Sequence, residues 1–127
     1  RESLAINQER LDYLRRTCRE LSTLPQTQLV ETLHWNNEHE CRAIVNARMM
    51  GVVDKLESNY PQLSFDDIRF CILVLLDIPY AEMADILHRS QNSIGKRKAL
   101  VGKKLHVSMA NLRHLLLDIA TQNKPKS

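Results

Sequence analysis

The sequence predicts an all-α fold, with a two-helix N-terminal extension followed by a four-helix domain. Hydrophobic residues make up 43% of the 127 residues, whereas glycine and proline occur only three and four times, a composition typical of packed helical proteins. Apolar side chains recur at helical spacing, and no stretch alternates with the two-residue period of a strand. A chain of this length holds one ordinary domain, or one small domain with an extension.

The first predicted helix covers residues 2–24 and ends at Pro25. Its apolar side chains form a heptad seam, with steps of 7, 3, 4 and 3 residues, made of Leu4, Leu11, Leu14, Cys18 and Leu21. The seam is shorter than the three to four heptads that a coiled coil needs. Two alternatives therefore stay open: a homodimer paired through Leu4, Leu11, Leu14 and Leu21, or packing on the second helix of the same chain.

A second helix is predicted from about Thr27 to Ser58. The side chains that recur at helical spacing on one face of this helix are Val30, His34, Cys41, Val45, Met49, Val52 and Leu56. The run from Asn59 to Pro61 then interrupts the pattern. The chain is thus expected to divide into a helical linker or dimerisation segment over 1–59, a C-terminal domain over 60–121 and a disordered tail over 122–127.

Four short helices are predicted in the C-terminal domain, each from a start signal and an apolar face. They cover about 65–77, 80–88, 91–105 and 109–121, with Ser64, Pro79, Ser90 and Ser108 at their N-termini. Asp67, three residues after Ser64, adds an acid in the first turn. The second and third helices, joined through His88 and Ser90, meet the length rules of a helix-turn-helix.

The third helix of this domain, over 91–105, has two contrasting faces. At 100° per residue, Ile94, Val101 and Leu105 lie within about 20° of a common direction and predict a core face. The opposite face carries Asn92, Lys96, Ala99 and Lys103, of which the long side chains can reach base edges while the small alanine permits close approach. Flanking Ser93, Arg97 and Lys104 are expected to hold phosphates. The alternative is a solvated surface helix without a partner.

The charge distribution supports a polyanionic partner. Residues 1–61 carry 8 basic and 9 acidic groups, whereas residues 62–127 carry 10 and 6. The stretch from His88 to His106 contains six lysines or arginines and no carboxylate. Such a stripe is what a nucleic acid requires, so double-stranded DNA is the expected partner.

The segment from Leu63 to Leu105, LSFDDIRFCILVLLDIPYAEMADILHRSQNSIGKRKALVGKKL, resembles the LuxR-type (NarL/FixJ-like) C-terminal helix-turn-helix, especially the Bacteroidetes variants that follow a YPxLS element. The matching positions are Tyr60, Pro61 and Leu63, then Glu82, Met83 and Ala84, then Ser90, Ser93 and Ile94, then Lys98, Lys103, Lys104 and Leu105. The resemblance implies that the third helix reads the DNA groove, that the last helix assists dimerisation, and that a sensor precedes the domain.

Two positions of the chain depart from this family pattern. His88 stands where glycine or asparagine is common, but histidine tolerates a left-handed turn better than most residues. Gly95 stands where a basic contact residue is common. With Gly102, it is expected to cost the helix about 1 kcal/mol apiece relative to alanine.

Several other functions are disfavoured by the sequence. Cys18, Cys41 and Cys71 form no CxxC pair, and His34 and His39 lack a metal-ligand spacing, so neither a disulfide framework nor a metal or other cofactor is expected. No catalytic motif is present, and no enzyme activity is expected. The longest apolar run, Phe70–Leu76, is too short to cross a bilayer.

The expected function is sequence-specific DNA binding by a transcriptional regulator, in the cytoplasm or on the cytoplasmic side of a membrane anchor. Because the chain begins with Arg1, it is expected to be the output module of a longer protein with an upstream sensor. Two alternatives stay open: a promoter-binding domain like sigma-factor region four, which would also contact RNA polymerase, and a helical adaptor that binds only protein. No small-molecule substrate is expected.

Overall fold

The computed structural model describes residues 2–122, with side chains from residue 7 onward, and within that range it contains helices and no strands. The helices are α1 (Glu2–Ser22), α2 (Gln26–Thr32), α3 (Glu38–Arg48), α4 (Val52–Asn59), α5 (Phe65–Leu75), α6 (Tyr80–Leu87), α7 (Gln91–Leu105) and α8 (Met109–Thr121). The predicted all-α class is confirmed. Within residues 2–122, none of the helices combines the length and apolar character that crossing a membrane requires.

The four C-terminal helices lie where the sequence predicted them. α7 has the predicted bounds, and α5, α6 and α8 differ from theirs by at most two residues. α5 begins with a capping box: the backbone N–H of Asp67 donates to Ser64 Oγ at 3.1 Å, and Ser64 N–H donates to Asp67 Oδ2 at 3.0 Å. Both bonds satisfy amides that the first turn leaves unpaired.

The prediction of one long helix over 27–58 was wrong, because the chain turns twice within it. His34 has φ 47° and ends the first segment, after which the Asn37 side chain accepts a hydrogen bond from Glu40 N–H and starts α3. The second break lies at Met50 and Gly51, with φ of 59° and 71°. A left-handed backbone cannot continue an α-helix, so the N-terminal extension holds four helices and not two.

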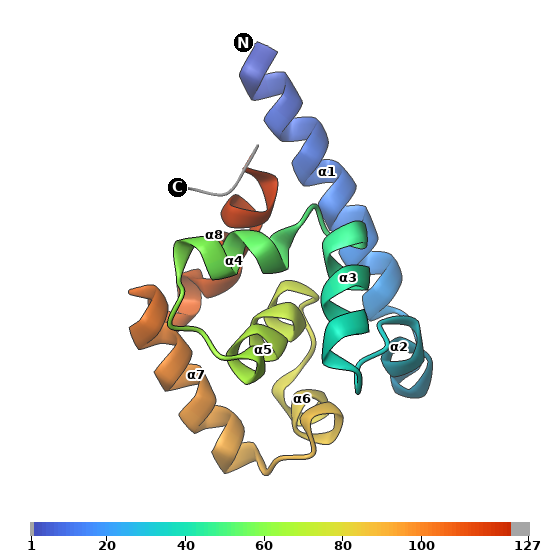
Figure 1. The fold of residues 1–127 in the computed structure, drawn as a ribbon, viewed down its shortest axis with the longest axis vertical. Helices are drawn as coiled ribbons and strands as arrows, with labels where there is room; N and C mark the ends of the chain where they lie inside the picture. The colour runs from blue at the N-terminus through green and yellow to red at the C-terminus, as the bar shows by residue number, and fades with distance from the viewer. Residues whose placement is uncertain (1, 123–127) are drawn as a thin grey trace.

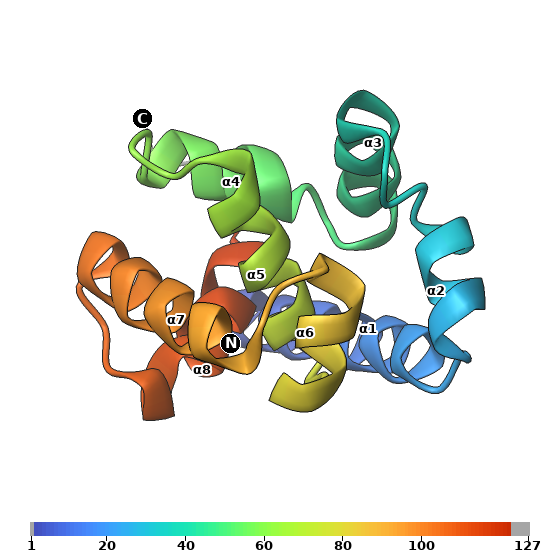
Figure 2. The same cartoon turned by 90° about the horizontal axis from the view of Figure 1, so that it is seen from below.

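Figure 1 shows α1 and α7 on opposite sides of the molecule with α5 between them, and Figure 2 gives the same arrangement from below. α8 packs against α1, α4, α5 and α7, so helices from both halves of the chain meet on it. One apolar core includes side chains from both sides of the expected boundary at residue 59, such as Val45, Leu56, Phe70 and Leu116. The N-terminal helices are therefore part of the same folded body as α5–α8.

The heptad seam of α1 lies largely inside this core. Leu14, Cys18 and Leu21 are buried within a single chain, and Leu11 is half-buried against them. The Leu4 side chain lies outside the described residues. α1 packs mainly against α8 and not against the expected second helix, while pairing between chains stays a prediction.

The C-terminal end of α8 is held by cations from two N-terminal helices. Lys55 Nζ of α4 donates to Ala120 O at 2.8 Å and to Gln122 O at 2.5 Å, and Arg10 Nη1 of α1 donates to Thr121 O at 3.3 Å. Burial, and then the charge of Arg10, lower the pKa of Lys55. These bonds satisfy carbonyls that the last turn of a helix leaves unpaired, and a cation at this end also interacts favourably with the helix dipole.

Candidate nucleic-acid interface

α6 and α7 are consecutive helices joined by a short turn. α6 ends at His88, which adopts the left-handed conformation at φ 55° and ψ 45°. Arg89 N–H donates back to Ala84 O at 2.9 Å and closes the end of α6. Ser90 then starts α7 by accepting a hydrogen bond from Ser93 N–H at 3.1 Å. The expected left-handed turn at His88 and N-cap at Ser90 are both confirmed.

The two predicted faces of α7 are also confirmed. Ile94, Val101 and Leu105 are buried in the core. The exposed side chains include five of the seven predicted DNA-contacting residues, namely Asn92, Ser93, Lys96, Ala99 and Lys103. Lys96 and Lys103 are two turns apart, so their Cα atoms are about 10 Å apart along the axis. This face thus presents two cations and an amide with a small residue between them.

The other two predicted residues, Arg97 and Lys104, point to a carboxylate of the same chain. Arg97 Nη1 lies 2.7 Å from Asp67 Oδ1, and Lys104 Nζ lies 2.6 Å from Asp67 Oδ2. Both cations are half-buried, whereas Asp67 is fully buried. The structure therefore gives them an intramolecular role, fixing α7 on the start of α5, and the expected phosphate contacts stay a prediction.

The charge on Asp67 is stabilised by these partners. Burial by itself raises the pKa of the carboxyl, but hydrogen bonds from Lys104, the Ser64 backbone and Arg97 outweigh burial and hold the pKa below its ordinary value. The carboxylate accepts bonds on both oxygens and is ionised at neutral pH. It therefore acts as a buried anchor that sets the position of α7 relative to α5.

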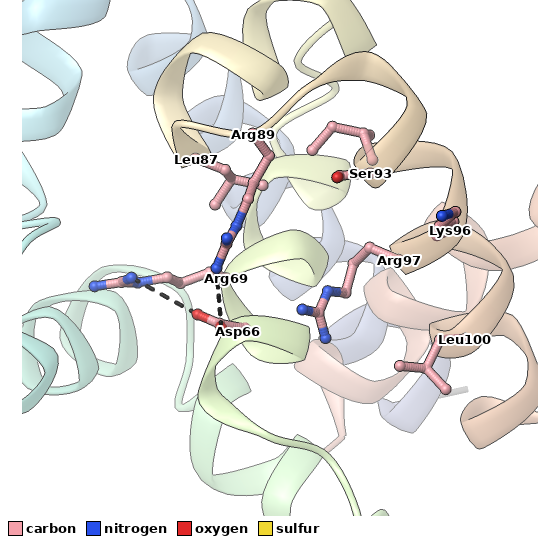
Figure 3. A pocket seen from close by; sticks show the side chains of 9 residues that line it. Asp66, Arg69, Leu87, Arg89, Ser93, Lys96, Arg97 and Leu100 are labelled. Atoms are coloured by element: carbon pink, nitrogen blue, oxygen red, sulfur yellow. Dashed lines mark ion pairs between the residues drawn. The ribbon is translucent and has the colours of Figure 1, made fainter.

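A basic pocket of about 360 Å³ lies beside α7, between its N-terminal half, the α6–α7 turn and α5. Asp66 pairs with Arg69 at 3.9 Å and with Arg89 at 4.0 Å, and Figure 3 shows Arg97 pointing from α7 toward this group. Lys96 also lines the pocket. Arg89 belongs to the turn and extends the positive surface beyond α7. Sequence reasoning did not assign Arg89 to the site, although its place directly before the N-cap Ser90 is a usable signal.

Leu100 also lies on the margin of this surface, with 41% of its area exposed. On the other margin, Lys98 Nζ lies 4.7 Å from the centre of the Tyr80 ring, a distance at which the ring attracts a cation. Neither side chain was among the predicted contact residues. The position of Lys98 depends on how α6 packs beside α7, which the helical spacing of α7 does not reveal.

The two glycines of α7 differ in their surroundings. A Cβ at Gly95 would meet nothing within 4 Å, whereas a Cβ at Gly102 would lie 2.7 Å from Met109 Cε and 3.1 Å from Val107 O. We expect Gly95→Ala to raise the free energy of unfolding by about 0.5–1 kcal/mol through helix propensity. Gly102→Ala should give no such gain, because the new Cβ must displace the Met109 side-chain end and approach the backbone oxygen of Val107. Urea denaturation followed by circular dichroism measures both, and an equal gain from the two substitutions would contradict the close approach at Gly102.

The three cysteines are poor candidates for chemistry. All are buried, and burial raises the pKa of Cys18 to about 11 and that of Cys71 to about 12, with the pKa of Cys41 also raised. A protonated, buried thiol is a weak nucleophile. The candidate site is therefore the exposed, basic face of α7 and not a thiol.

Comparison with protein-family models, with curated proteins and with solved structures gives no match to this chain.

Proposed function

We propose that α6 and α7 form a DNA-binding helix-turn-helix and that the chain is a sequence-specific transcriptional regulator of the LuxR type, acting in the cytoplasm. The observation that carries this proposal is the exposed face of α7, on which Asn92, Lys96, Ala99 and Lys103 lie opposite a fully buried face. A helix with this pattern fits the major groove, where amide and ammonium groups reach base edges.

The surroundings of α7 support the same function. Asp67 neutralises one of the two cations beside it, so the net charge near α7 stays positive. Arg89 at the turn adds a further cation that is exposed to solvent. Contacts to phosphates from residues such as Arg89 and Lys96 would position the helix, while the centre of α7 would read the bases.

A homodimer is part of the proposal, because one recognition helix covers only a few base pairs and two helices one DNA turn apart multiply affinity. Leu14, Cys18 and Leu21 of the α1 seam are buried within the chain, so we expect the dimer to use another surface. An upstream sensor domain is proposed from the family resemblance, and contact with RNA polymerase is proposed from the sigma-factor-like alternative.

The decisive variant is Lys96→Glu, in which the charge is reversed on the exposed face of α7. Duplexes are first selected from a random-sequence library with the wild-type chain, and binding is then measured by gel shift and fluorescence anisotropy. We expect Lys96→Glu to weaken binding at least about 100-fold, through loss of a contact and added repulsion. Its circular dichroism spectrum should match that of the wild-type chain, because the side chain is exposed.

Arg16→Glu is the matched control for Lys96→Glu, since it makes the same charge change at an exposed position of α1 and should leave affinity within about twofold of wild type. The logarithm of the binding constant should also fall with the logarithm of salt concentration, at about −3 per chain for three or four phosphate contacts. Failure to select any duplex, or equal losses from both variants, would favour the protein-binding adaptor over the DNA-binding regulator.

A further inference from the structure

A second charged surface lies on the side of α1 and α8, away from the exposed face of α7. Arg15, Arg19 and Arg113 line a pocket of about 230 Å³ between these two helices and the start of the α5–α6 loop. Arg15 and Arg19 are one helical turn apart on α1 and are exposed, whereas Arg113 comes from α8. The three guanidinium groups thus come to one concave surface from helices about 100 residues apart in sequence.

The charge of this pocket is not balanced by ion pairs. Among the side chains that the structure describes, none makes an ion pair with Arg15, Arg19 or Arg113. Asp77 is the carboxylate among the lining residues, so the pocket carries a net positive charge. Guanidinium groups favour planar oxyanions because their N–H groups form a fork that matches two oxygens at once.

A second pocket adjoins the arginine pocket. Its volume is about 460 Å³, and Asp77 and Arg113 line both pockets. Polar and apolar atoms share its surface about equally, and its apolar lining residues are Val74, Ile78, Pro79, Tyr80, Met83, Met109 and Leu112. Tyr80 is 44% exposed and Met109 half-exposed, so apolar surface is open to solvent there. We call the two pockets together the α1–α8 groove.

We propose that the α1–α8 groove docks an acidic, partly apolar segment of a partner protein. Carboxylates of the segment pair with Arg15, Arg19 and Arg113, and an adjacent apolar side chain enters the pocket beside Tyr80 and Met109. Arginine, tyrosine and methionine are the residue types enriched at protein interfaces, and methionine adapts its shape to a bound side chain. The arginine pocket thus binds the acidic end of the segment, and the adjoining pocket binds its apolar end.

Nucleic acid fits this groove less well than it fits α7. Protein–DNA interfaces are polar and strongly basic throughout, whereas half of this groove is apolar. Its lining residues come from α1, α5, α6, α8 and the α5–α6 loop, so docking there leaves the exposed face of α7 uncovered. The inference is therefore independent of the proposed DNA binding and can hold or fail without it.

The test is a nuclear magnetic resonance titration of the ¹⁵N-labelled full chain with a synthetic 14-residue amphipathic peptide that carries four glutamates and three leucines. We expect amide shifts to concentrate at residues 15–22, 77–83 and 109–113. A peptide with every glutamate replaced by glutamine should bind at least about 10-fold more weakly, as should one with every leucine replaced by serine.

The matched variants are Arg19→Glu and Arg16→Glu, which make the same charge change at exposed positions of α1. Arg16 is outside the lining of the groove. Arg19→Glu should weaken the peptide at least about 10-fold, whereas Arg16→Glu should stay within twofold. Equal effects of the two variants, equal binding of the glutamine peptide, shifts centred on α7, or no saturable binding would each overturn the proposal. So would displacement of the peptide by a 12-base-pair duplex that shifts the same groove residues, since that would identify the groove as a nucleic-acid contact.

Discussion

Asp67→Ala should lower the free energy of unfolding by about 3–5 kcal/mol, because it removes one partner of a buried ion network and leaves the other charges uncompensated. Asp67 is fully buried and accepts bonds from Arg97, Lys104 and Ser64. Its loss also removes half of the capping box of α5. The effect should appear in urea denaturation followed by circular dichroism, as a lower midpoint with an unchanged slope.

Asp66→Ala is the matched control for Asp67→Ala, because the neighbouring carboxylate is half-exposed and forms only long surface pairs with Arg69 and Arg89. Its loss should lower the free energy of unfolding by less than about 1 kcal/mol.

The pH dependence of stability provides a second test of Asp67. The pKa of Asp67 is lowered in the folded protein, so its stabilisation is fully present above the ordinary carboxyl pKa and is lost as pH falls through the folded value. A wild-type and an Asp67→Asn protein that lose stability in parallel on acidification would contradict this role.

Leu14→Lys should prevent the chain from folding as a cooperative unit. Leu14 is 0% exposed and lies on α1, which packs against α8. An unpaired ammonium at such a position costs more than about 4 kcal/mol, a large part of the 5–15 kcal/mol that stabilises a typical domain. Circular dichroism should show a loss of helix at 25 °C, and sedimentation velocity should show an expanded or aggregated chain.

Tyr13→Lys is the control for Leu14→Lys, at a neighbouring position that is 47% exposed, and it should leave the helix content unchanged. The pair of variants separates the two roles considered for the α1 seam. If the wild-type chain is a dimer and the Leu14→Lys protein is a folded monomer, the seam pairs between chains and does not pack on α8 of the same chain.

The C-terminal half could be predicted from the sequence because its signals are local. Ser64, Ser90 and Ser108 mark the starts of α5, α7 and α8, and the positions of Ile94, Val101 and Leu105 define the buried face of α7. A cap and a helical period depend on residues within a turn or two of each other. The exposed face of α7 follows from the same period and was predicted with it.

The features that were missed depend on backbone conformation or on distant contacts. The helix expected over 27–58 is broken by positive φ values at His34 and at Met50, and neither residue type by itself marks such a break in a sequence. Arg97 and Lys104 are residue types that often bind phosphate. In this structure both pair with Asp67, which lies 30 and 37 residues earlier in the chain. Only the packing of α7 on α5 brings these charges together.

The hydrogen bonds from Lys55 and Arg10 to the end of α8 determine which fragments of this protein can fold. α8 supports α7 on one side and α1 and α4 on the other, and its terminal carbonyls depend on donors supplied by α1 and α4. A chimaera that transplanted only residues 60–121 would carry α8 with an exposed apolar side and with the carbonyls of Ala120 and Thr121 lacking their donors. A fragment that is to fold with α7 in place must therefore include the first 59 residues, because the N-terminal helices support α8 and α8 supports α7.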